Sequence, residues 1–210
     1  MTVTAHSGAF NTPDNTIENV KKVLEENCET FEIDVTFRPS GTPVIIHDGN
    51  PSENEGVLLE KVFELVSEHN CNAKINLDIK STSNLPEIDN LLKKYGLTDR
   101  AFYTGVFTDW VDKVKANSSV PYYLNDSVEE NKRNDAESLN ALADKVIKLG
   151  AIGLNINYEN VTPLMTEIFR TRNIPVSVWT INDKETAEKY IRMGADNITT
   201  KNPEIFKDLF

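Results

Sequence analysis

Two carboxylates, Glu32 and Asp34, alternate with apolar residues over the segment 31–35, which reads FEIDV. A period of two predicts a β-strand, because successive side chains of a strand point to opposite faces, and it places both carboxylates on one face. The segment 75–80, INLDIK, repeats the pattern and contributes Asp78. Two strands that each direct acidic side chains to one side indicate a common polar site rather than a solvated surface.

Two of the three histidines, His6 and His47, end further strand-like segments, residues 2–6 (TVTAH) and 43–47 (PVIIH). Imidazole titrates close to neutral pH, so two histidines at a common site can act as general acid and general base. The alternative for each is a structural histidine that satisfies a hydrogen bond at a strand end. Because the two flank the acidic strand in sequence, we favour the catalytic interpretation. His69 is predicted to end a helix and to have a structural role.

The three carboxylates also predict a metal site. If they lie together away from water, they repel one another, so either their pKa values rise or a cation neutralises them. Oxygen ligands alone suit a hard divalent cation, Mg²⁺ or Ca²⁺, better than they suit zinc. The alternative is that Glu32 and Asp34 face a neighbouring helix and pair with lysine or arginine.

Lys80 and Trp179 are candidate substrate contacts that also have structural alternatives. Lys80 comes two residues after Asp78, where its ammonium could hold a bound anion or could be the counter-charge of Asp78 or Glu32. Trp179 ends a predicted strand, where it could belong to the core or form the floor of a substrate pocket. Neither alternative is decided by the residue pattern.

Strand-like and helix-like segments alternate about eight times, which predicts an α/β fold of the (β/α)₈ TIM-barrel type. An open, doubly wound sheet is the alternative. In a barrel the C-terminal strand ends form the catalytic face, and the candidate residues lie at these ends. The predicted strands are 2–6, 31–35, 74–80, 101–106, 120–124, 152–156, 175–180 and 197–200, with 43–47 as a short ribbon. The predicted helices are 16–27, capped by Asp14 or Asn15, and 57–69, 84–95, 109–116, 139–149, 163–172, 184–193 and 203–210.

The 210 residues, 39% hydrophobic and 26% charged, predict one globular domain over residues 1–210. The net charge of −11 argues against a nucleic-acid partner and against adhesion to an anionic membrane. No apolar run has the length of a membrane span, and the N-terminus lacks a signal-peptide pattern. We therefore expect a small-molecule partner and a cytoplasmic location, with secretion left open if a signal peptide was removed. Cys28 and Cys71 are predicted to be reduced thiols.

Several short motifs resemble those of the glycerophosphodiester phosphodiesterase family and follow its order along the chain. They are residues 5–9 (AHSGA), 14–16 (DNT), 31–35 (FEIDV), 41–48 (GTPVIIHD), 77–80 (LDIK), 178–183 (VWTIND) and 194–200 (GADNITT). The resemblance implies a phospholipase C-like phosphodiesterase TIM barrel. It also implies hydrolysis of a glycerophosphodiester to an alcohol and glycerol 3-phosphate with a bound divalent cation.

The same resemblance implies a role for each candidate residue. Mg²⁺ or Ca²⁺ would be held by Glu32, Asp34 and Asp78. Protons would be transferred by His6 and His47, with acid and base not distinguished. The substrate would be contacted by Lys80, Trp179 and Ser7.

Three features depart from the family pattern. Ser7 follows His6 where the family has arginine, and serine cannot make the bidentate contact of arginine with phosphate. The third carboxylate is Asp78 where glutamate is usual, and the segment 48–56 is too short for the usual insertion. All three features are similar to the sphingomyelinase D-like phospholipases, which form a cyclic phosphate by intramolecular attack.

Two alternatives to hydrolysis follow from these departures. The protein could cyclise a phospholipid, or it could be a barrel that has lost activity and binds a phosphorylated ligand. The segments 14–16 and 47–48 resemble the phosphodiesterases more closely, so we rank hydrolysis first. The oligomeric state is not indicated by the sequence.

Overall fold

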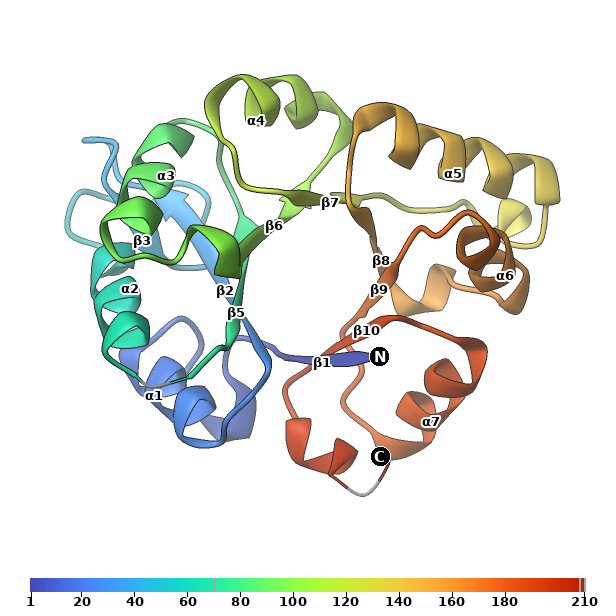
Figure 1. The fold of residues 1–210 in the computed structure, drawn as a ribbon, viewed down its shortest axis with the longest axis horizontal. Coiled ribbons are helices and arrows are strands. Elements are labelled where there is room, and N and C mark those ends of the chain that lie inside the picture. The colour runs from blue at the N-terminus through green and yellow to red at the C-terminus, as the bar shows by residue number, and fades with distance from the viewer. Residues whose placement is uncertain (70, 208, 210) are drawn as a thin grey trace.

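The computed structural model describes residues 1–69, 71–207 and 209. In this part of the chain eight parallel strands form a barrel, and β1 pairs with both β10 and β2, which closes the sheet (Figure 1). Closure confirms the predicted (β/α)₈ barrel and excludes the open sheet. The barrel strands are β1 (Thr2–Ala5), β2 (Thr30–Phe37), β5 (Lys74–Ile79), β6 (Ala101–Val106), β7 (Tyr122–Asn125), β8 (Gly153–Asn157), β9 (Val176–Trp179) and β10 (Asn197–Thr200).

Helices surround the barrel, and most of their ends differ from the predicted ends by one to three residues (Figure 1). The α-helices are α1 (Ile17–Glu25), α2 (Leu59–Glu68), α3 (Leu85–Lys94), α4 (Val111–Asn117), α5 (Ala136–Leu149), α6 (Pro163–Thr171) and α7 (Lys184–Met193). Short 3₁₀ helices are η1 (Ala9–Asn11), η2 (Thr98–Arg100), η3 (Thr108–Trp110), η4 (Glu130–Lys132), η5 (Tyr158–Asn160) and η6 (Pro203–Phe206). The helix predicted over 203–210 is reduced to η6, and residues 208 and 210 of that prediction lie outside the described part.

The apolar and polar faces of the strands separate as the period of two requires. On β5, Ile75, Leu77 and Ile79 belong to the buried apolar core, whereas Asn76 and Asp78 line a cavity. The usual interior of a TIM barrel is filled by branched aliphatic side chains. The interior of this barrel carries polar side chains instead, and these can form a functional site.

The chain between β2 and α2 departs from a simple alternation. The last three residues of β2 pair antiparallel with β3 (Pro43–Ile45), and β3 pairs with β4 (Val57–Leu58). The strand predicted over 43–47 therefore ends at Ile45. The helix predicted over 57–69 begins at Leu59, because the two residues before it join the ribbon.

Two sequence predictions near the site are wrong. Thr16, not Asp14 or Asn15, caps α1, and its Oγ1 accepts a hydrogen bond from Asn19 N at 3.1 Å. Glu32 was expected, with the other candidate residues, at the C-terminal end of its strand, but β2 begins at Thr30 and extends to Phe37 through its ribbon, so Glu32 lies in the first half. It still lies at the barrel end, because Phe31 pairs with Ala5, the last residue of β1.

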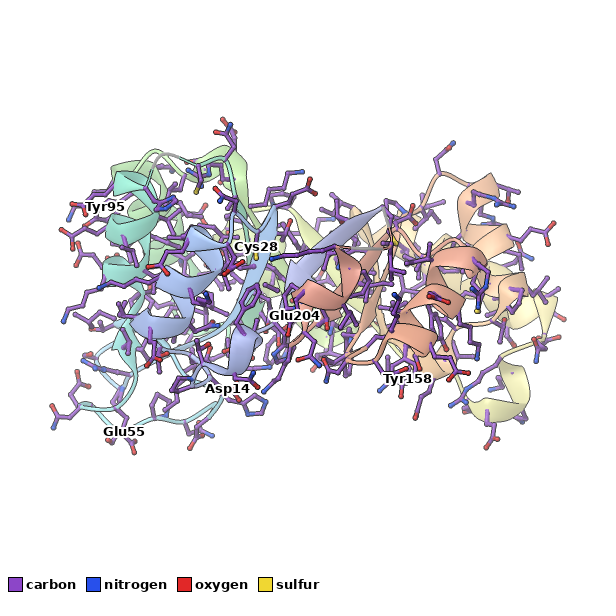
Figure 2. The ribbon with its side chains drawn as sticks, turned by 90° about the horizontal axis from the view of Figure 1, so that it is seen from below. Asp14, Cys28, Glu55, Tyr95, Tyr158 and Glu204 are labelled. Atoms are coloured by element: carbon purple, nitrogen blue, oxygen red, sulfur yellow. The ribbon has the colours of Figure 1, made fainter. Side chains whose placement is uncertain are left out.

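The loops that follow the strands gather at one end of the barrel. In the side view of Figure 2, Asp14, Glu55 and Tyr158 lie toward this end, whereas Tyr95, which follows a helix, lies toward the other. Cys28 and Cys71 are free, partly buried thiols, and burial raises the pKa of Cys28 to about 11. Among the described helices, none has the length and apolar character to cross a membrane.

Candidate active site

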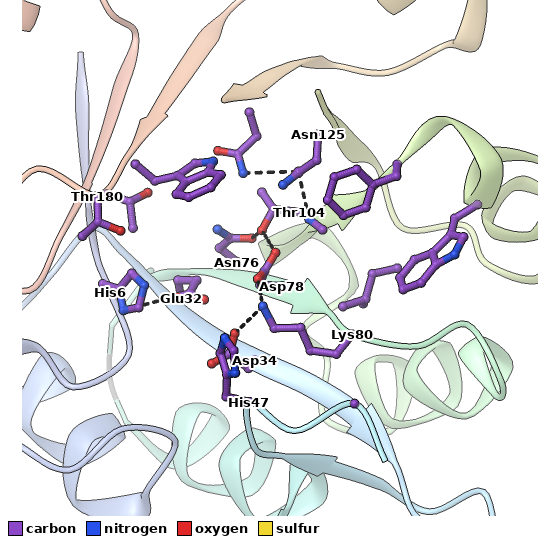
Figure 3. A pocket seen from close by; sticks show the side chains of 18 residues that line it. His6, Glu32, Asp34, His47, Asn76, Asp78, Lys80, Thr104, Asn125 and Thr180 are labelled. Carbon is purple, nitrogen blue, oxygen red and sulfur yellow. Dashed lines mark hydrogen bonds and ion pairs between the residues drawn. The ribbon is translucent and has the colours of Figure 1, made fainter. Parts of the chain in front are cut away.

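A cavity of about 540 Å³ opens at the C-terminal ends of the barrel strands, where TIM-barrel active sites lie (Figure 3). Seven of the eight candidate site residues line it; they are His6, Glu32, Asp34, His47, Asp78, Lys80 and Trp179. Tertiary structure thus brings together residues that are up to 173 positions apart in the chain, from His6 to Trp179. Ser7 is the exception.

The three carboxylates converge because β2 and β5 are neighbours in register. Asp34 pairs with Asp78, and Glu32 pairs with Asn76, so their side chains share the inner face of the sheet. One oxygen from each of the three carboxylates lies within 4.8 Å of the others. Glu32 and Asp34 are only 5% and 4% exposed, which excludes the alternative of a solvated acidic face.

Lys80 is the counter-charge of this group. Its Nζ lies 2.9 Å from Asp34 Oδ1 and 2.5 Å from Asp78 Oδ2. Burial acts to lower the pKa of Lys80, but Asp78 and Asp34 outweigh it and raise that pKa, so the ammonium stays charged. Lys80 therefore ties together the carboxylates of two strands.

One ammonium does not neutralise three carboxylates, of which Glu32 and Asp34 are buried and Asp78 is partly buried. Burial, together with the charges of Asp34 and Asp78, raises the pKa of Glu32 well above its usual value, while Ser7 N and Lys80 oppose the shift. A divalent cation would bring the group to neutrality, and an all-oxygen donor set suits Mg²⁺ or Ca²⁺. The residues present therefore fit such a cation.

The two histidines flank the carboxylates. His6 lies beside Glu32, and His47 lies beside Asp34 (Figure 3). Nδ1 of His6 is 2.7 Å from the carbonyl oxygen of Ser7 and 3.5 Å from Glu32 Oε2. Because a carbonyl oxygen only accepts, Nδ1 carries a proton, and Nε2 is the nitrogen of His6 that can exchange one.

His47 reaches the cavity by way of the ribbon. It follows β3 by two residues, and the neighbouring Ile46 N donates to the carbonyl oxygen of Asp34 at 3.1 Å, which joins this segment to β2. His47 is exposed, whereas His6 is partly buried. His47, predicted from the segment 43–47 as a site residue, therefore lines the cavity, although β3 is not a barrel strand.

Ser7 lies beneath the cavity rather than in its lining. It is fully buried, its N donates to Glu32 Oε2 at 3.0 Å, and its Oγ accepts from Asn15 N at 2.6 Å. The substrate contact expected for Ser7 is not possible from this position without rearrangement. The turn that follows needs glycine: Gly8 has φ +80°, and a Cβ there would lie 1.8 Å from Asp14 Oδ1.

Asn15 is a site residue that sequence reasoning took for a helix cap. Its Nδ2 donates to Asp34 Oδ2 at 2.7 Å, and its Oδ1 accepts from Asp34 N at 2.9 Å. Asn15 adopts φ +54°, a conformation that asparagine tolerates better than most residues. It fixes the orientation of Asp34 and links it to Ser7.

We expect Asn15→Gly to reduce the affinity for a divalent cation by about 10- to 100-fold, the usual loss when a group that orients a metal-binding side chain is removed. Glycine keeps the positive φ and deletes both hydrogen bonds. Calorimetric titration with Ca²⁺ measures the effect. The matched control is Asn173→Gly, because Asn173 has φ +55° at an exposed position after α6. Equal values in the two variants would contradict a positioning role.

Buried amides and a hydroxyl line the part of the cavity that faces β6, β7 and β8. Thr104 Oγ1 lies 2.9 Å from Asp78 Oδ1 and 2.8 Å from Asn76 Oδ1. Asn125 Oδ1 accepts from Gly105 N at 2.9 Å and from Asn155 Nδ2 at 3.2 Å. In Figure 3, Asn125 lies across the cavity from His47. Sequence reasoning missed these polar residues; polar side chains at the ends of the strands were the available signal.

A family model matches most of the chain. The model of the glycerophosphoryl diester phosphodiesterase family matches residues 49–205. This range contains Asp78, Lys80 and Trp179 but begins after His6 and His47. Side chains from the first 48 residues line the same cavity, and this observation is independent of the family match.

Relatives extend the similarity to nearly the whole chain. A glycerophosphodiester phosphodiesterase from Caldanaerobacter subterraneus subsp. tengcongensis is 22% identical, and the alignment covers 99% of this chain and 96% of the relative. A glycerophosphodiester phosphodiesterase structure from Thermotoga maritima is 21% identical, with a TM-score of 0.70 and coverage of 100% and 98%. A phosphodiesterase from Oleispira antarctica, solved with its product sn-glycerol-3-phosphate, is 17% identical, with a TM-score of 0.78 and coverage of 99% and 96%.

Proposed function

Because the chain belongs to the glycerophosphoryl diester phosphodiesterase family, we propose that it is a metal-dependent hydrolase that converts glycerophosphodiesters to an alcohol and glycerol 3-phosphate. The observation that carries this proposal is the cluster of Glu32, Asp34 and Asp78 within 4.8 Å, in a cavity that His6 and His47 also line. The three carboxylates would hold the cation, Mg²⁺ or Ca²⁺.

Each residue of the site has its own role in the proposed hydrolysis. When bound, the cation supplies positive charge to the phosphate oxygens, on which negative charge develops. Lys80 adds a second positive charge beside the phosphate while it remains paired with Asp34 and Asp78. One histidine takes a proton from the attacking water, and the other gives a proton to the alcohol that leaves. Nε2 of His6 performs its share, because Nδ1 is held by Ser7 O.

The departures from the family pattern shape how the phosphate is held. In place of an arginine next to His6, Ser7 is buried and supports Glu32 from below. Without a bidentate arginine, substrate binding relies on the cation, on Lys80 and on the remaining cavity wall. We expect weaker ground-state binding of the phosphate than an arginine would provide, which appears as a higher KM.

The test is phosphorus NMR of glycerophosphodiesters incubated with the protein and Ca²⁺ or Mg²⁺. We expect a phosphate monoester signal from glycerol 3-phosphate, which excess EDTA prevents and added cation restores. A cyclic phosphate as the end product would instead show intramolecular attack. No turnover, with a divalent cation still bound in a calorimetric titration, would overturn the enzymatic proposal in favour of a ligand-binding barrel.

A further inference from the structure

Strand β6 carries a bulge beside the carboxylate cluster. Three residue steps on β6, from Tyr103 to Val106, match two steps on β7, so β6 has one residue more over this stretch. Gly105, within the same stretch, adopts φ +74°. A bulge bends its strand and re-aims the side chains next to it. On its other side β6 pairs with β5, the strand that carries Asp78.

Gly105 lets β5 and β6 approach closely at this point. A Cβ at Gly105 would lie 2.5 Å from the carbonyl oxygen of Ile79 and 2.8 Å from Asp78 Oδ1, so a larger residue would push β6 away from β5. Asn125 of β7 holds the bulge from the other side. Its Oδ1 accepts from Gly105 N at 2.9 Å and from Asn155 Nδ2 at 3.2 Å. The bulge is therefore fixed between β5 and β7 (Figure 3).

The bulge directs the hydroxyl group of Thr104 at Asp78. Thr104 is 2% exposed, and its Oγ1 lies 2.9 Å from Asp78 Oδ1 and 2.8 Å from Asn76 Oδ1. The hydroxyl group has one proton for these two acceptors, and an ionised carboxylate attracts it more strongly than an amide oxygen does. Lys80 Nζ contacts the other oxygen, Asp78 Oδ2, at 2.5 Å. Both oxygens of Asp78 are held, which sets the plane of the carboxylate.

The other two carboxylates of the cluster are held in a comparable way. Glu32 accepts from Ser7 N, and Asp34 accepts from Asn15 Nδ2. Asp78 differs from them in its neighbour, because its donor comes from the adjacent barrel strand. An aspartate carries its carboxylate less far from its strand than a glutamate does, so a donor on the next strand reaches it only where the two strands lie close together. The bulge of β6 provides that approach.

We propose that Thr104 is a positioning residue of the cation site, whose hydroxyl group holds Asp78 in the orientation in which this carboxylate binds a divalent cation together with the other two. The inference rests on the metal-dependent function proposed above and adds a residue of β6 to it. Thr104 acts through Asp78. The bulge at Gly105 and the amide of Asn125 keep Thr104 in place.

The test is calorimetric titration of the wild type, Thr104→Val and Thr104→Ser with Ca²⁺. Valine keeps the branched shape and removes the hydroxyl group. We therefore expect the Ca²⁺ affinity of Thr104→Val to fall by about 10-fold or more, as is usual when a group that orients a metal ligand is lost. Serine keeps the hydroxyl group, so Thr104→Ser should bind Ca²⁺ within about threefold of the wild type.

Thr166→Val is the matched control. Thr166 of α6 is 5% exposed, and its Oγ1 donates to the carbonyl oxygen of Pro163 at 3.0 Å, outside the cavity lining. Each valine variant loses one buried hydrogen bond, so both should melt at a lower temperature than the wild type in EDTA. Only Thr104→Val should also bind Ca²⁺ less tightly, which a merely structural role would not cause.

A double-mutant cycle shows whether Thr104 acts through Asp78. In Asp78→Glu the longer side chain carries the carboxylate away from the hydroxyl group, so adding Thr104→Val should lower the Ca²⁺ affinity of that variant by about twofold or less. An undiminished loss in the Asp78→Glu background would overturn the inference. So would wild-type affinity in Thr104→Val, or a loss in Thr104→Ser equal to that in Thr104→Val.

The titration involves no turnover, so its outcome is separable from the proposed hydrolysis. A protein that binds Ca²⁺ with the expected pattern but hydrolyses no phosphodiester would keep the inference and lose the reaction. A wild-type protein that binds neither Ca²⁺ nor Mg²⁺ would overturn both.

Discussion

Replacement of either His6 or His47 by alanine is expected to lower kcat for a glycerophosphodiester by about 10²- to 10⁴-fold, the usual contribution of a general acid or base. Both side chains line the cavity, and they flank the carboxylate cluster from β1 and from the ribbon. Neither packs in the apolar core, so the loss should arise in the chemical step. Circular dichroism and the melting temperature should remain close to wild type.

The two histidines can be told apart by the leaving group. A nitrophenyl diester has a leaving group that needs no protonation, so loss of the general acid should matter much less for it than for an alkyl diester. Loss of the general base should impair both substrates alike. The histidine whose alanine variant regains activity on the nitrophenyl ester is therefore the acid.

His69→Ala is the control for these variants, because His69 is the remaining histidine and caps the C-terminus of α2 outside the cavity lining. It should keep kcat near the wild-type value. Full activity in His6→Ala or His47→Ala would remove the affected residue from the proton-transfer assignment. An equal loss in His69→Ala would point to a general effect on folding.

Substitution of Glu32 by glutamine is expected to have opposite effects on function and on stability. Activity and Ca²⁺ affinity should fall by orders of magnitude, because a charged cation ligand is lost from a site of three. The metal-free protein should become more stable at neutral and alkaline pH. Glutamine occupies nearly the same volume, and its carbonyl oxygen can still accept the hydrogen bond from Ser7 N.

The direction of the pH dependence follows from the pKa of Glu32. Burial and the charges of Asp34 and Asp78 raise this pKa in the folded, metal-free protein well above the usual value of a glutamate. The folded state then holds the proton more tightly than the unfolded state does, so stability falls as pH rises from the unfolded pKa through the folded one. The advantage of Glu32→Gln should be absent below about pH 4 and grow above it.

Thermal unfolding in EDTA at a series of pH values measures this effect. Each kcal/mol should move the melting temperature by about 2–4 °C for a chain of this size. Saturating Ca²⁺ should raise the melting temperature of the wild type but not that of Glu32→Gln. Glu29→Gln, at an exposed carboxylate just before β2, is the matched control. A Glu32→Gln variant that is less stable than wild type at pH 8 in EDTA would refute the argument.

Prediction from sequence succeeded where a local period sets the direction of a side chain. The alternation in 31–35 and 75–80 placed Glu32, Asp34 and Asp78 on inner faces, and the register of β2 with β5 brought them together. It failed where a residue has two local roles. Asn15 next to Thr16 resembles a helix cap, but only the position of Asp34 shows that its side chain holds that carboxylate.

Ser7 and two aromatic residues of the cavity lining, Phe107 and Trp110, illustrate a second kind of failure. Ser7 stands next to His6 in sequence, yet it is buried, because it lies in the turn after β1, where its N and Oγ hydrogen-bond to Glu32 and Asn15 beneath the cavity. Phe107 and Trp110 lie in a loop that has no period to read. That they line the same cavity as Trp179 depends on how the barrel closes, which is a property of all its strands together.

The sequence by itself determined the alternation of strands and helices, and with it the acidic inner faces, since both follow from side-chain periodicity along the chain. Tertiary structure alone decided which residues meet. Closure of the barrel joined β1 to β2 and β10, and this brought His6 to Glu32. The reason is physical: a period sets the direction of a side chain, whereas proximity between distant segments requires the complete hydrogen-bonded sheet.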